Sequence, residues 1–330
     1  MRAHPEDTTG EDGDRPRLHP PRDRATRCRP GDASLKVADF HYDLPEEAIA
    51  QTAIEPRHDS RLLDTRDLSD HRFHELPDLL DPGDLVVVNE TRVRAARLRG
   101  TRRDTGGRVE LLLLEYLDDG TWETLARPAR RLRPGVVIDL GGLVATVLST
   151  HEAGRLIVGF DSDDDEQAVT ETGEMPLPPY FTGVLHDPER YQTIFATIPG
   201  SAAAPTAGLH FTDSVVGRLR ERRVVMASVD LHVSLDTFRP MTTEDVEDHT
   251  MHSEWCSVPE TTARAVAYTR ARGCKVVAIG TTVIRALETM ADGRGGVEPG
   301  ERRTELFLRP GSEITVADVL VTNFHMPGST

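Results

Sequence analysis

Four histidines in the second half of the chain combine a residue type that transfers protons with a setting beside apolar residues. They are His210 in Leu209-His210-Phe211, His232 in Leu231-His232-Val233, His252 after Met251, and His325 after Phe324. A neutral imidazole packs acceptably in a core when one ring nitrogen is hydrogen-bonded, so each histidine alone is more often structural than catalytic. Imidazole also titrates near neutral pH, which suits it to take up and release protons. Four of them within one half of the chain favour a shared site.

A glycine turn precedes a predicted helix in the same half of the chain. Residues 275–279 predict a strand, and Gly280-Thr281-Thr282 leads from it into a helix that carries Arg285. Free N–H groups at the start of such a helix attract anions, so the turn is typical of carboxylate or phosphate binding. The threonines also suit helix N-caps, and Arg285 is spaced to pair with Glu288 one turn on. Both interpretations stay open.

One spacing resembles a metal site. His252-x-Glu254 matches the H-x-E of zinc nucleobase deaminases, and Cys256 lies on the same face of an extended segment. The P-C-x-x-C that would supply the other two ligands does not follow, and Cys28, Cys256 and Cys274 are scattered as free thiols. We therefore expect no metal, and a metal-dependent nucleobase hydrolase ranks last among the functional hypotheses.

The net charge of −16 is distributed unevenly. Between residues 85 and 135, eleven arginines stand against seven acidic residues. Such a patch can bind phosphates through paired N–H groups, or it can be the solvated face of strands and loops. The arginines are Arg92, Arg94, Arg97, Arg99, Arg102, Arg103, Arg108, Arg127, Arg130, Arg131 and Arg133.

Composition shifts predict the domain organisation. Residues 1–35 are rich in Pro, Arg, Asp and Gly without a hydrophobic period, which predicts a disordered tail. Short β-rich segments from residue 84 to about 160 predict a small antiparallel barrel or sandwich, and residues 161–166 and 175–179 are expected to form a linker. Helix and strand then alternate. The predicted fold is a large α/β domain, residues 36–75 and 165–330, with an inserted small antiparallel β-barrel domain, residues 76–164.

Individual elements are predicted as well. The expected β-rich segments are 85–88, 109–114, 122–125, 136–140, 143–148 and 156–160. Further along, we expect helices opened by Asp187-Pro188 and by Thr212, a strand over 224–233 and a helix over 259–273.

Several sequence motifs occur in a fixed order along the chain: Pro205-Thr206-Ala207-Gly208-Leu209-His210-Phe211-Thr212, Met251-His252-Ser253-Glu254-Trp255, Gly280-Thr281-Thr282 and Asn323-Phe324-His325-Met326. They resemble the S-adenosylmethionine:tRNA ribosyltransferase-isomerases of queuosine biosynthesis, and the resemblance runs from Asp39 to the last residue. It implies an enzyme that uses S-adenosylmethionine as a ribosyl donor. The acceptor is 7-aminomethyl-7-deazaguanine at the tRNA wobble position, and the products are epoxyqueuosine-tRNA, adenine and methionine.

Carried over residue by residue, the resemblance implies a set of site residues. Catalytic roles fall to His210, His232, His252 and His325, with Glu254 as an orienting or basic partner. Binding of S-adenosylmethionine falls to Thr281, Thr282, Arg285, Arg239 and Asn323. The implied partner is the modified tRNA, with no metal, no membrane and no obligate protein partner, and we expect a cytoplasmic monomer.

The chain also departs from the family pattern. Ser234 and Asp236 stand where the family has glycine, which affects any position that needs positive φ or close approach to a ligand. The family continues into an apolar segment after the residues that match the end of this chain, so we expect either a gene model cut short at Thr330 or a paralogue without the last helix. The alternative to the enzyme is a noncatalytic tRNA-binding paralogue of the same fold.

Overall fold

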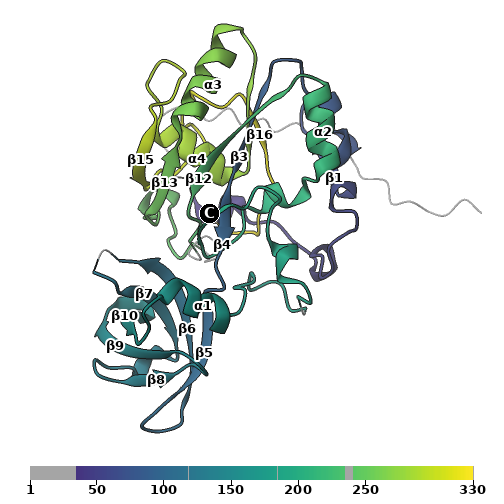
Figure 1. The fold of residues 1–330 in the computed structure, drawn as a ribbon. Coiled ribbons are helices and arrows are strands. Elements are labelled where there is room, and N and C mark those ends of the chain that lie inside the picture. The colour runs from purple at the N-terminus through teal and green to yellow at the C-terminus, as the bar shows by residue number, and fades with distance from the viewer. Residues whose placement is uncertain (1–34, 118, 184, 235–240, 330) are drawn as a thin grey trace, which may run out of the picture.

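The computed structural model describes residues 35–117, 119–183, 185–234 and 241–329. The predicted disordered tail, apart from Leu35, lies outside the described residues. The larger part of the molecule is built on a six-stranded sheet with the order β15-β13-β12-β3-β14-β16 (Figure 1). Four neighbouring strands, β12, β3, β14 and β16, are parallel to one another. β13 pairs antiparallel with β12 on one side and with β15 on the other. The bounds are β3 Leu85–Asn89, β12 Val225–Leu231, β13 Glu254–Val258, β14 Val276–Ile279, β15 Gly300–Thr304 and β16 Val319–Val321.

β3 is a central strand of this sheet and is buried along its whole length. Leu85 and Val87 pack into the core on one face, and Val86 and Val88 pack into the core on the other. A wholly apolar run is typical of a parallel strand covered on both faces. The prediction that residues 85–88 belong with the barrel segments is wrong, because a β-rich run does not by itself indicate which sheet it joins.

Helices cover both faces of the sheet. α3 (Glu260–Ala271) and α4 (Thr281–Thr289) pack on one face, and α2 (Asp213–Glu221) packs on the other with the 3-10 helix η4 (Phe73–Leu79). Figure 1 shows α2 on the opposite side of the sheet from α3. Gly280, which precedes α4, has a φ of 92°, a conformation that glycine adopts without steric cost. These layers confirm the predicted α/β architecture, and α2, α3 and α4 begin where the sequence indicates.

The smaller part is a closed antiparallel barrel with the order β10-β7-β6-β5-β8-β9, in the lower half of Figure 1. Its strands are β5 Arg97–Arg102, β6 Arg108–Tyr116, β7 Trp122–Arg127, β8 Val137–Asp139, β9 Val144–Thr150 and β10 Arg155–Phe160. Alternate residues of β6 face a core that contains Trp122. The predicted β-barrel is confirmed. β5 was not predicted, since Leu98 is the single apolar residue in its sequence.

Two short ladders lie outside the large sheet and the barrel. β4 (Thr91–Val93) pairs in parallel with β11 (Ile198–Ser201), and β1 (Arg61–Asp64) pairs with β2 (Ser69–Arg72) as a hairpin.

A helix that the sequence did not predict lies between the two expected linker segments and includes the last two residues of the first segment, 165–166. α1 (Asp165–Thr172) begins after Asp164, whose side chain accepts a 3.0 Å hydrogen bond from the N–H of Gln167. Acidic residues at a helix start are stabilising, which explains why the end of the acidic run begins a helix. Val169 packs into the barrel core, so α1 sits with the barrel although it was grouped with the α/β part. The exact domain boundaries stay a prediction.

Short 3-10 helices make up much of the remaining chain. They are η1 Val37–Phe40, η2 Glu46–Ala48, η3 Arg57–Asp59, η5 Ala129–Arg131, η6 Glu152–Gly154, η7 Pro188–Tyr191, η8 Thr206–His210 and η10 Val246–Asp248. The helix expected after Asp187 is therefore a single 3-10 turn, capped by the Asp187 side chain. Within the described part of the chain, no helix has both the length and the apolar character needed to cross a membrane.

Candidate active site

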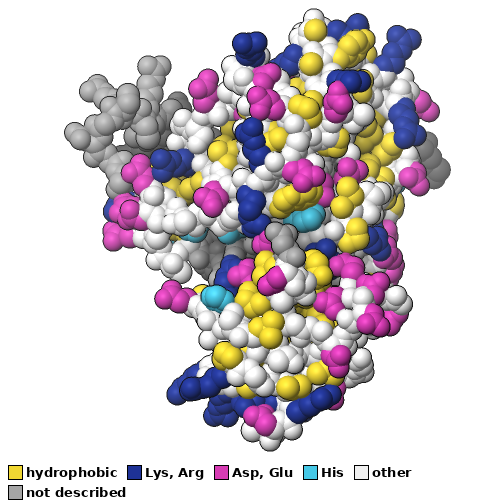
Figure 2. All heavy atoms as spheres, turned by 60° about the vertical axis from the view of Figure 1, so that its left-hand side comes forward, with side chains coloured by type: hydrophobic (Ala, Val, Ile, Leu, Met, Phe, Trp, Pro, Cys, Tyr) yellow, Lys and Arg dark blue, Asp and Glu magenta, His cyan; other side chains and the backbone are white. Residues whose placement is uncertain are grey.

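The predicted site residues come together at one edge of the six-stranded sheet. The carboxyl ends of β12, β3, β14 and β16 meet there, beside the amino end of the antiparallel β13. Ligands of open α/β sheets bind outside this edge. The residues it gathers are His232 and Ser234 after β12, Thr281 after β14, Asn323 after β16 and Glu254 at the start of β13. Figure 2 shows histidine side chains, in cyan, around the hollowed junction between this part and the barrel.

Glu254 is the buried centre of one group, with 1% of its side chain exposed. Its Oε1 accepts a 2.7 Å hydrogen bond from the N–H of Ser234 and lies 3.1 Å from Nε2 of His252. Its Oε2 accepts a hydrogen bond from Nη1 of Arg285. Burial by itself raises the pKa of Glu254, but His252, the charge of Arg285 and the Ser234 N–H outweigh it and hold the pKa below its ordinary value. The carboxylate is therefore ionised and held in place.

Arg285 is buried and directs its guanidinium group at protein partners. Nε donates to the carbonyl of Leu306 at 3.1 Å, and Nη2 donates to the carbonyl of Thr304 at 3.4 Å. The pairing with Glu288 that its spacing allowed does not form, because Glu288 accepts hydrogen bonds from the N–H groups of residues 315–317. Arg285 thus holds Glu254 and the loop after β15 in place.

A second carboxylate–imidazole pair lies at the end of β12. Asp230 is buried, with its Oδ2 3.2 Å from Nε2 of His232, and its Oδ1 has no hydrogen-bond partner among the described residues. A buried carboxylate beside an imidazole fixes the tautomer and stabilises the imidazolium that forms when the ring takes up a proton. His232 keeps 29% of its side chain exposed and is therefore accessible. Sequence reasoning missed Asp230, although the two-residue period of a strand puts it on the same face as His232.

The ring of His232 is held from both sides. It lies against Trp255, with ring centroids 4.5 Å apart, and it covers Gly200, where an added Cβ would lie 2.1 Å from Nε2. The backbone N–H of His232 donates a hydrogen bond to the Trp255 carbonyl at 3.0 Å. The Asp230–His232 and His252–Glu254 pairs are therefore carried by neighbouring strand ends.

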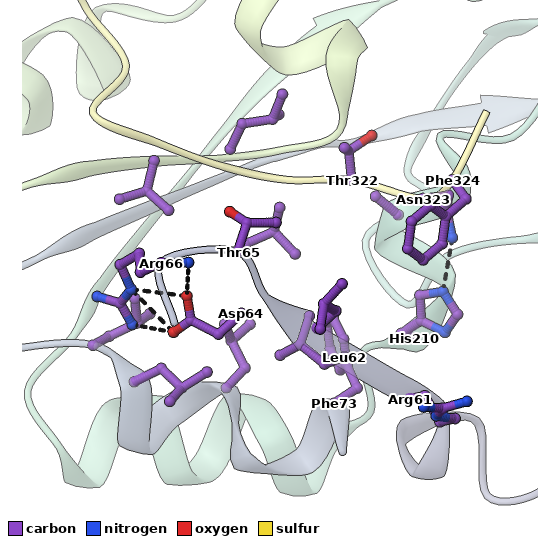
Figure 3. Close-up of a pocket in the computed structure, with 18 of the residues that line it drawn as sticks. Arg61, Leu62, Asp64, Thr65, Arg66, Phe73, His210, Thr322, Asn323 and Phe324 are labelled. Carbon is purple, nitrogen blue, oxygen red and sulfur yellow. Dashed lines mark hydrogen bonds and ion pairs between the residues drawn. The ribbon is translucent and has the colours of Figure 1, made fainter. Parts of the chain in front are cut away.

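His210 and Asn323 form a third group (Figure 3). Nε2 of His210 lies 3.1 Å from Nδ2 of Asn323, and the imidazole packs against Phe73. Burial is the main cause that lowers the pKa of His210, and the charges of Arg57 and Arg190 lower it further, against a hydrogen bond with the Arg57 backbone that raises it. His210 is accordingly neutral at pH 7. Oδ1 of Asn323 is buried and has no hydrogen-bond partner within the described chain.

A cavity of about 390 Å³ lies beside His210 and Asn323, between β1, η4 and the segment after β16. Figure 3 shows Leu62 and Phe73 among the side chains that line it. Apolar residues form most of its lining, and the charged residues Arg61, Asp64, Arg66 and Lys275 also contribute to it.

Asn89 joins two of the strand ends to α4. Its amide group bonds to both the carbonyl and the N–H of Leu231, at 2.9 and 3.1 Å, and its Nδ2 also lies 3.4 Å from Oγ1 of Thr282. Thr281 is the first residue of α4.

His325 lies after β16, its carbonyl accepts a hydrogen bond from the Tyr42 hydroxyl, and partial burial lowers its pKa. The prediction for Arg239 falls on a residue outside the described ranges.

Comparison with known proteins establishes the family. The model of a family described as "Queuosine biosynthesis protein" matches residues 37–330. Two curated S-adenosylmethionine:tRNA ribosyltransferase-isomerases, from Symbiobacterium thermophilum and Pelotomaculum thermopropionicum, are 48% and 46% identical over 303 residues, which is 90% of this chain and 89% of each relative. The chain belongs to this enzyme family. A solved S-adenosylmethionine tRNA ribosyltransferase from Thermotoga maritima is 34% identical, and the match covers 88% of this chain and 86% of that chain with a TM-score of 0.45.

Membership of the ribosyltransferase-isomerase family makes the departures from its pattern informative. Positive φ among the described non-glycine residues occurs at Leu68, Ala153 and Arg223, and Ser234 is not one of them. Ser234 instead uses its N–H to bind Glu254. Loss of glycine therefore costs no backbone strain at Ser234. Asp236 lies outside the described residues.

Packing decides the role of two further residues, Phe211 and His252. Phe211 is completely buried against Phe73 and Phe195, so it is a core residue. The zinc-like spacing at His252 does not form a cation site, because Glu254 is paired with Arg285 and Cys256 lies in the core of the sheet.

The arginines of the barrel divide into paired and unpaired groups. Arg92, Arg94, Arg99 and Arg102 form ion pairs with Glu189, Glu166, Glu110 and Asp104 respectively. Arg130, Arg131 and Arg133 are exposed and pair with no acidic residue of the described chain. Arg130 and Arg133 line a hollow of about 550 Å³ together with His151. Figure 2 shows Lys and Arg side chains, in dark blue, at the lower end of the barrel.

Proposed function

We propose that this enzyme transfers the ribosyl group of S-adenosylmethionine to 7-aminomethyl-7-deazaguanine at the tRNA wobble position and isomerises it. The products are epoxyqueuosine-tRNA, adenine and methionine. The observation that carries the proposal is the Asp230–His232 pair at the carboxyl edge of the sheet, with a second carboxylate–imidazole pair beside it. The family match supplies the reaction class.

The reaction needs a base because a sulfonium acidifies the hydrogens on the adjacent C5′ carbon. His232 is suited to this role, since its ring is partly exposed and a buried carboxylate stands behind it. Uptake of the proton gives an imidazolium, which Asp230 stabilises. His252, Glu254 and Arg285 are positioning residues in this account, because they engage one another and fix the neighbouring strand end.

Binding of S-adenosylmethionine is assigned to the remaining strand ends. The first N–H groups of α4, at Thr281 and Thr282, suit the methionine carboxylate. The unpartnered Oδ1 of Asn323 suits the exocyclic amine of adenine, a donor that would satisfy it. His210 holds the Asn323 amide, and His325 and Arg239 are assigned to the same site from the family pattern.

The tRNA backbone is assigned to the unpaired arginines of the barrel. Arg130, Arg131 and Arg133 are free to donate paired hydrogen bonds to phosphates, whereas Arg102 is occupied by Asp104 at 2.5 Å. We also propose that the protein is a monomer and that it acts in the cytoplasm.

A chromatographic assay for free adenine tests the proposal. We expect adenine release from S-adenosylmethionine when the tRNA carries 7-aminomethyl-7-deazaguanine, and none with the same tRNA carrying guanine. Release in the absence of tRNA would contradict the proposal. Binding of the modified tRNA without any adenine release, under conditions where a relative is active, would instead support the noncatalytic paralogue.

A further inference from the structure

Three metal-binding side chains converge at the base of the β1–β2 hairpin, away from the carboxylate–imidazole pairs described above. His58 and Asp59 belong to η3, immediately before β1, and His74 belongs to η4, immediately after β2. One ligand atom from each lies within 4.8 Å of the other two. Oδ1 of Asp59 lies 3.1 Å from Nδ1 of His74 and 3.9 Å from Nε2 of His58.

We propose that His58, Asp59 and His74 bind a divalent transition-metal ion, with Zn²⁺ as the best-matched ion. Zinc–nitrogen and zinc–oxygen bonds of about 2.0–2.2 Å place tetrahedral ligand atoms roughly 3.3 Å apart. The distances of 3.1 and 3.9 Å lie on either side of this value, and all three ligand atoms lie within 4.8 Å of one another, so the side chains must rotate closer together to hold the ion. Two imidazole nitrogens and one carboxylate oxygen are the donor set that zinc accepts, and a water completes the tetrahedron.

The surroundings prepare His58 to act as a ligand. Its Nδ1 lies 2.7 Å from Oγ1 of Thr212, which leaves Nε2 directed toward Asp59. A metal-binding histidine usually has its second nitrogen fixed in this way, and the partner orients the ring. The Thr212 hydroxyl also bonds to Ser214 and is therefore itself oriented. The side chains of the three ligands are 22%, 40% and 39% exposed, which gives an ion access from solvent.

The neighbouring charges are compatible with a cation. Arg72 and Arg218 direct their guanidinium groups at the backbone carbonyls of Asp59 and His74, which fixes the two ligand-bearing turns. Arg218 is neutralised by Asp78 at 2.6 Å, and Glu75 lies one residue after His74. The ion would join η3 and η4 across the hairpin and rest against the start of α2 through Thr212. This role is structural, and although Phe73 of η4 packs against His210, metal binding can be measured without the proposed ribosyl transfer.

Titration of the full-length metal-free protein with Co²⁺ and Zn²⁺ tests the site. We expect one equivalent of Co²⁺ to give visible d–d absorption, Zn²⁺ to displace it, and Zn²⁺ to raise the melting temperature, since a ligand of the native state stabilises it. His58→Ala and His74→Ala should each weaken binding about a hundredfold or more, and Thr212→Val about tenfold to a hundredfold. His71→Ala is the matched control, because His71 lies on the same hairpin outside the cluster. The metal affinity of this variant should equal that of the native protein.

Three results would overturn the proposal. Absence of stoichiometric binding by equilibrium dialysis would show that Asp59 merely accepts a hydrogen bond from His74. Equal affinity of the native protein and the His58→Ala/His74→Ala double variant would place the metal elsewhere. If either alanine variant fails to fold by circular dichroism, the Thr212→Val variant decides. This variant should fold, because the Thr212 side chain makes no capping hydrogen bond to α2. An unchanged metal affinity of Thr212→Val would rule the site out.

Discussion

Oε2 of Glu254 accepts a hydrogen bond from Nη1 of Arg285, and this contact joins the start of β13 to the first turns of α4 across 31 positions of the sequence. Both side chains are at least nine-tenths buried. The same carboxylate holds the Ser234 N–H and stands beside His252. Two charges in this setting are costly to separate, because each would be left buried without its partner.

Glu254→Gln should therefore destabilise the protein strongly. Removal of one member of a buried pair typically costs about 3–5 kcal/mol, and here it leaves the Arg285 guanidinium buried without its counter-charge. Denaturant unfolding measures the loss. Glu301→Gln, an exposed substitution on β15, is the control and should cost less than about 0.5 kcal/mol. Equal effects of the two substitutions would contradict the buried ion pair.

The contribution of Glu254 should also depend on pH. Its folded-state pKa is held below the ordinary value, so the unfolded chain binds a proton more readily at this residue. The stability difference between the native protein and Glu254→Gln should be fully present above about pH 4.5, the ordinary range of a glutamate. It should shrink as pH falls below that value through the folded-state pKa. A difference that stays constant down to the acid transition would show that the pair is not ionic.

Asp230→Asn tests the second pair. The substitution keeps the shape of the side chain and removes the charge that stabilises protonated His232, so adenine release should fall roughly 10²–10⁴-fold. Asp248→Asn, on an exposed turn, is the control. An unchanged rate of adenine release in Asp230→Asn would remove Asp230 and His232 from proton transfer.

His210→Gln and His252→Gln separate site histidines from core histidines. Both should keep the melting temperature within a few degrees of the parent and lower adenine release at least about a hundredfold. His71→Gln on β2 is the control, because His71 belongs to none of the proposed site groups. Early melting of both variants would return the two residues to a structural role.

Arg130→Ala with Arg133→Ala should weaken binding of the modified tRNA. The log–log slope of affinity against salt should decrease by about one unit for each lost phosphate contact. Affinity for S-adenosylmethionine should not change. Arg102→Ala is the matched control, since its guanidinium is paired with Asp104 and should contribute little. If Arg102→Ala weakens binding as much as the double variant, the distinction between paired and unpaired arginines is wrong.

The sequence by itself determined the family, the α/β class and the presence of an antiparallel barrel. Local signals suffice for these features: alternation in β6 and β7, a glycine before α4, and words such as Met251-His252-Ser253-Glu254-Trp255. It also indicated that the histidines share one half of the chain. It did not determine which sheet β3 joins, because that depends on pairing with strands more than a hundred residues away.

Only the tertiary structure decided the partners of the site residues. The spacing of Arg285 and Glu288 along the sequence predicts a local pair. In the structure, Glu288 instead accepts hydrogen bonds from the backbone N–H groups of 315–317, and Arg285 pairs with Glu254. Asp230 belongs to no recognisable sequence motif. Its place in the candidate site follows from its burial beside His232. A hydrogen bond or ion pair depends on two groups meeting in space, and the spacing of residues along a strand or helix specifies only one side of that contact.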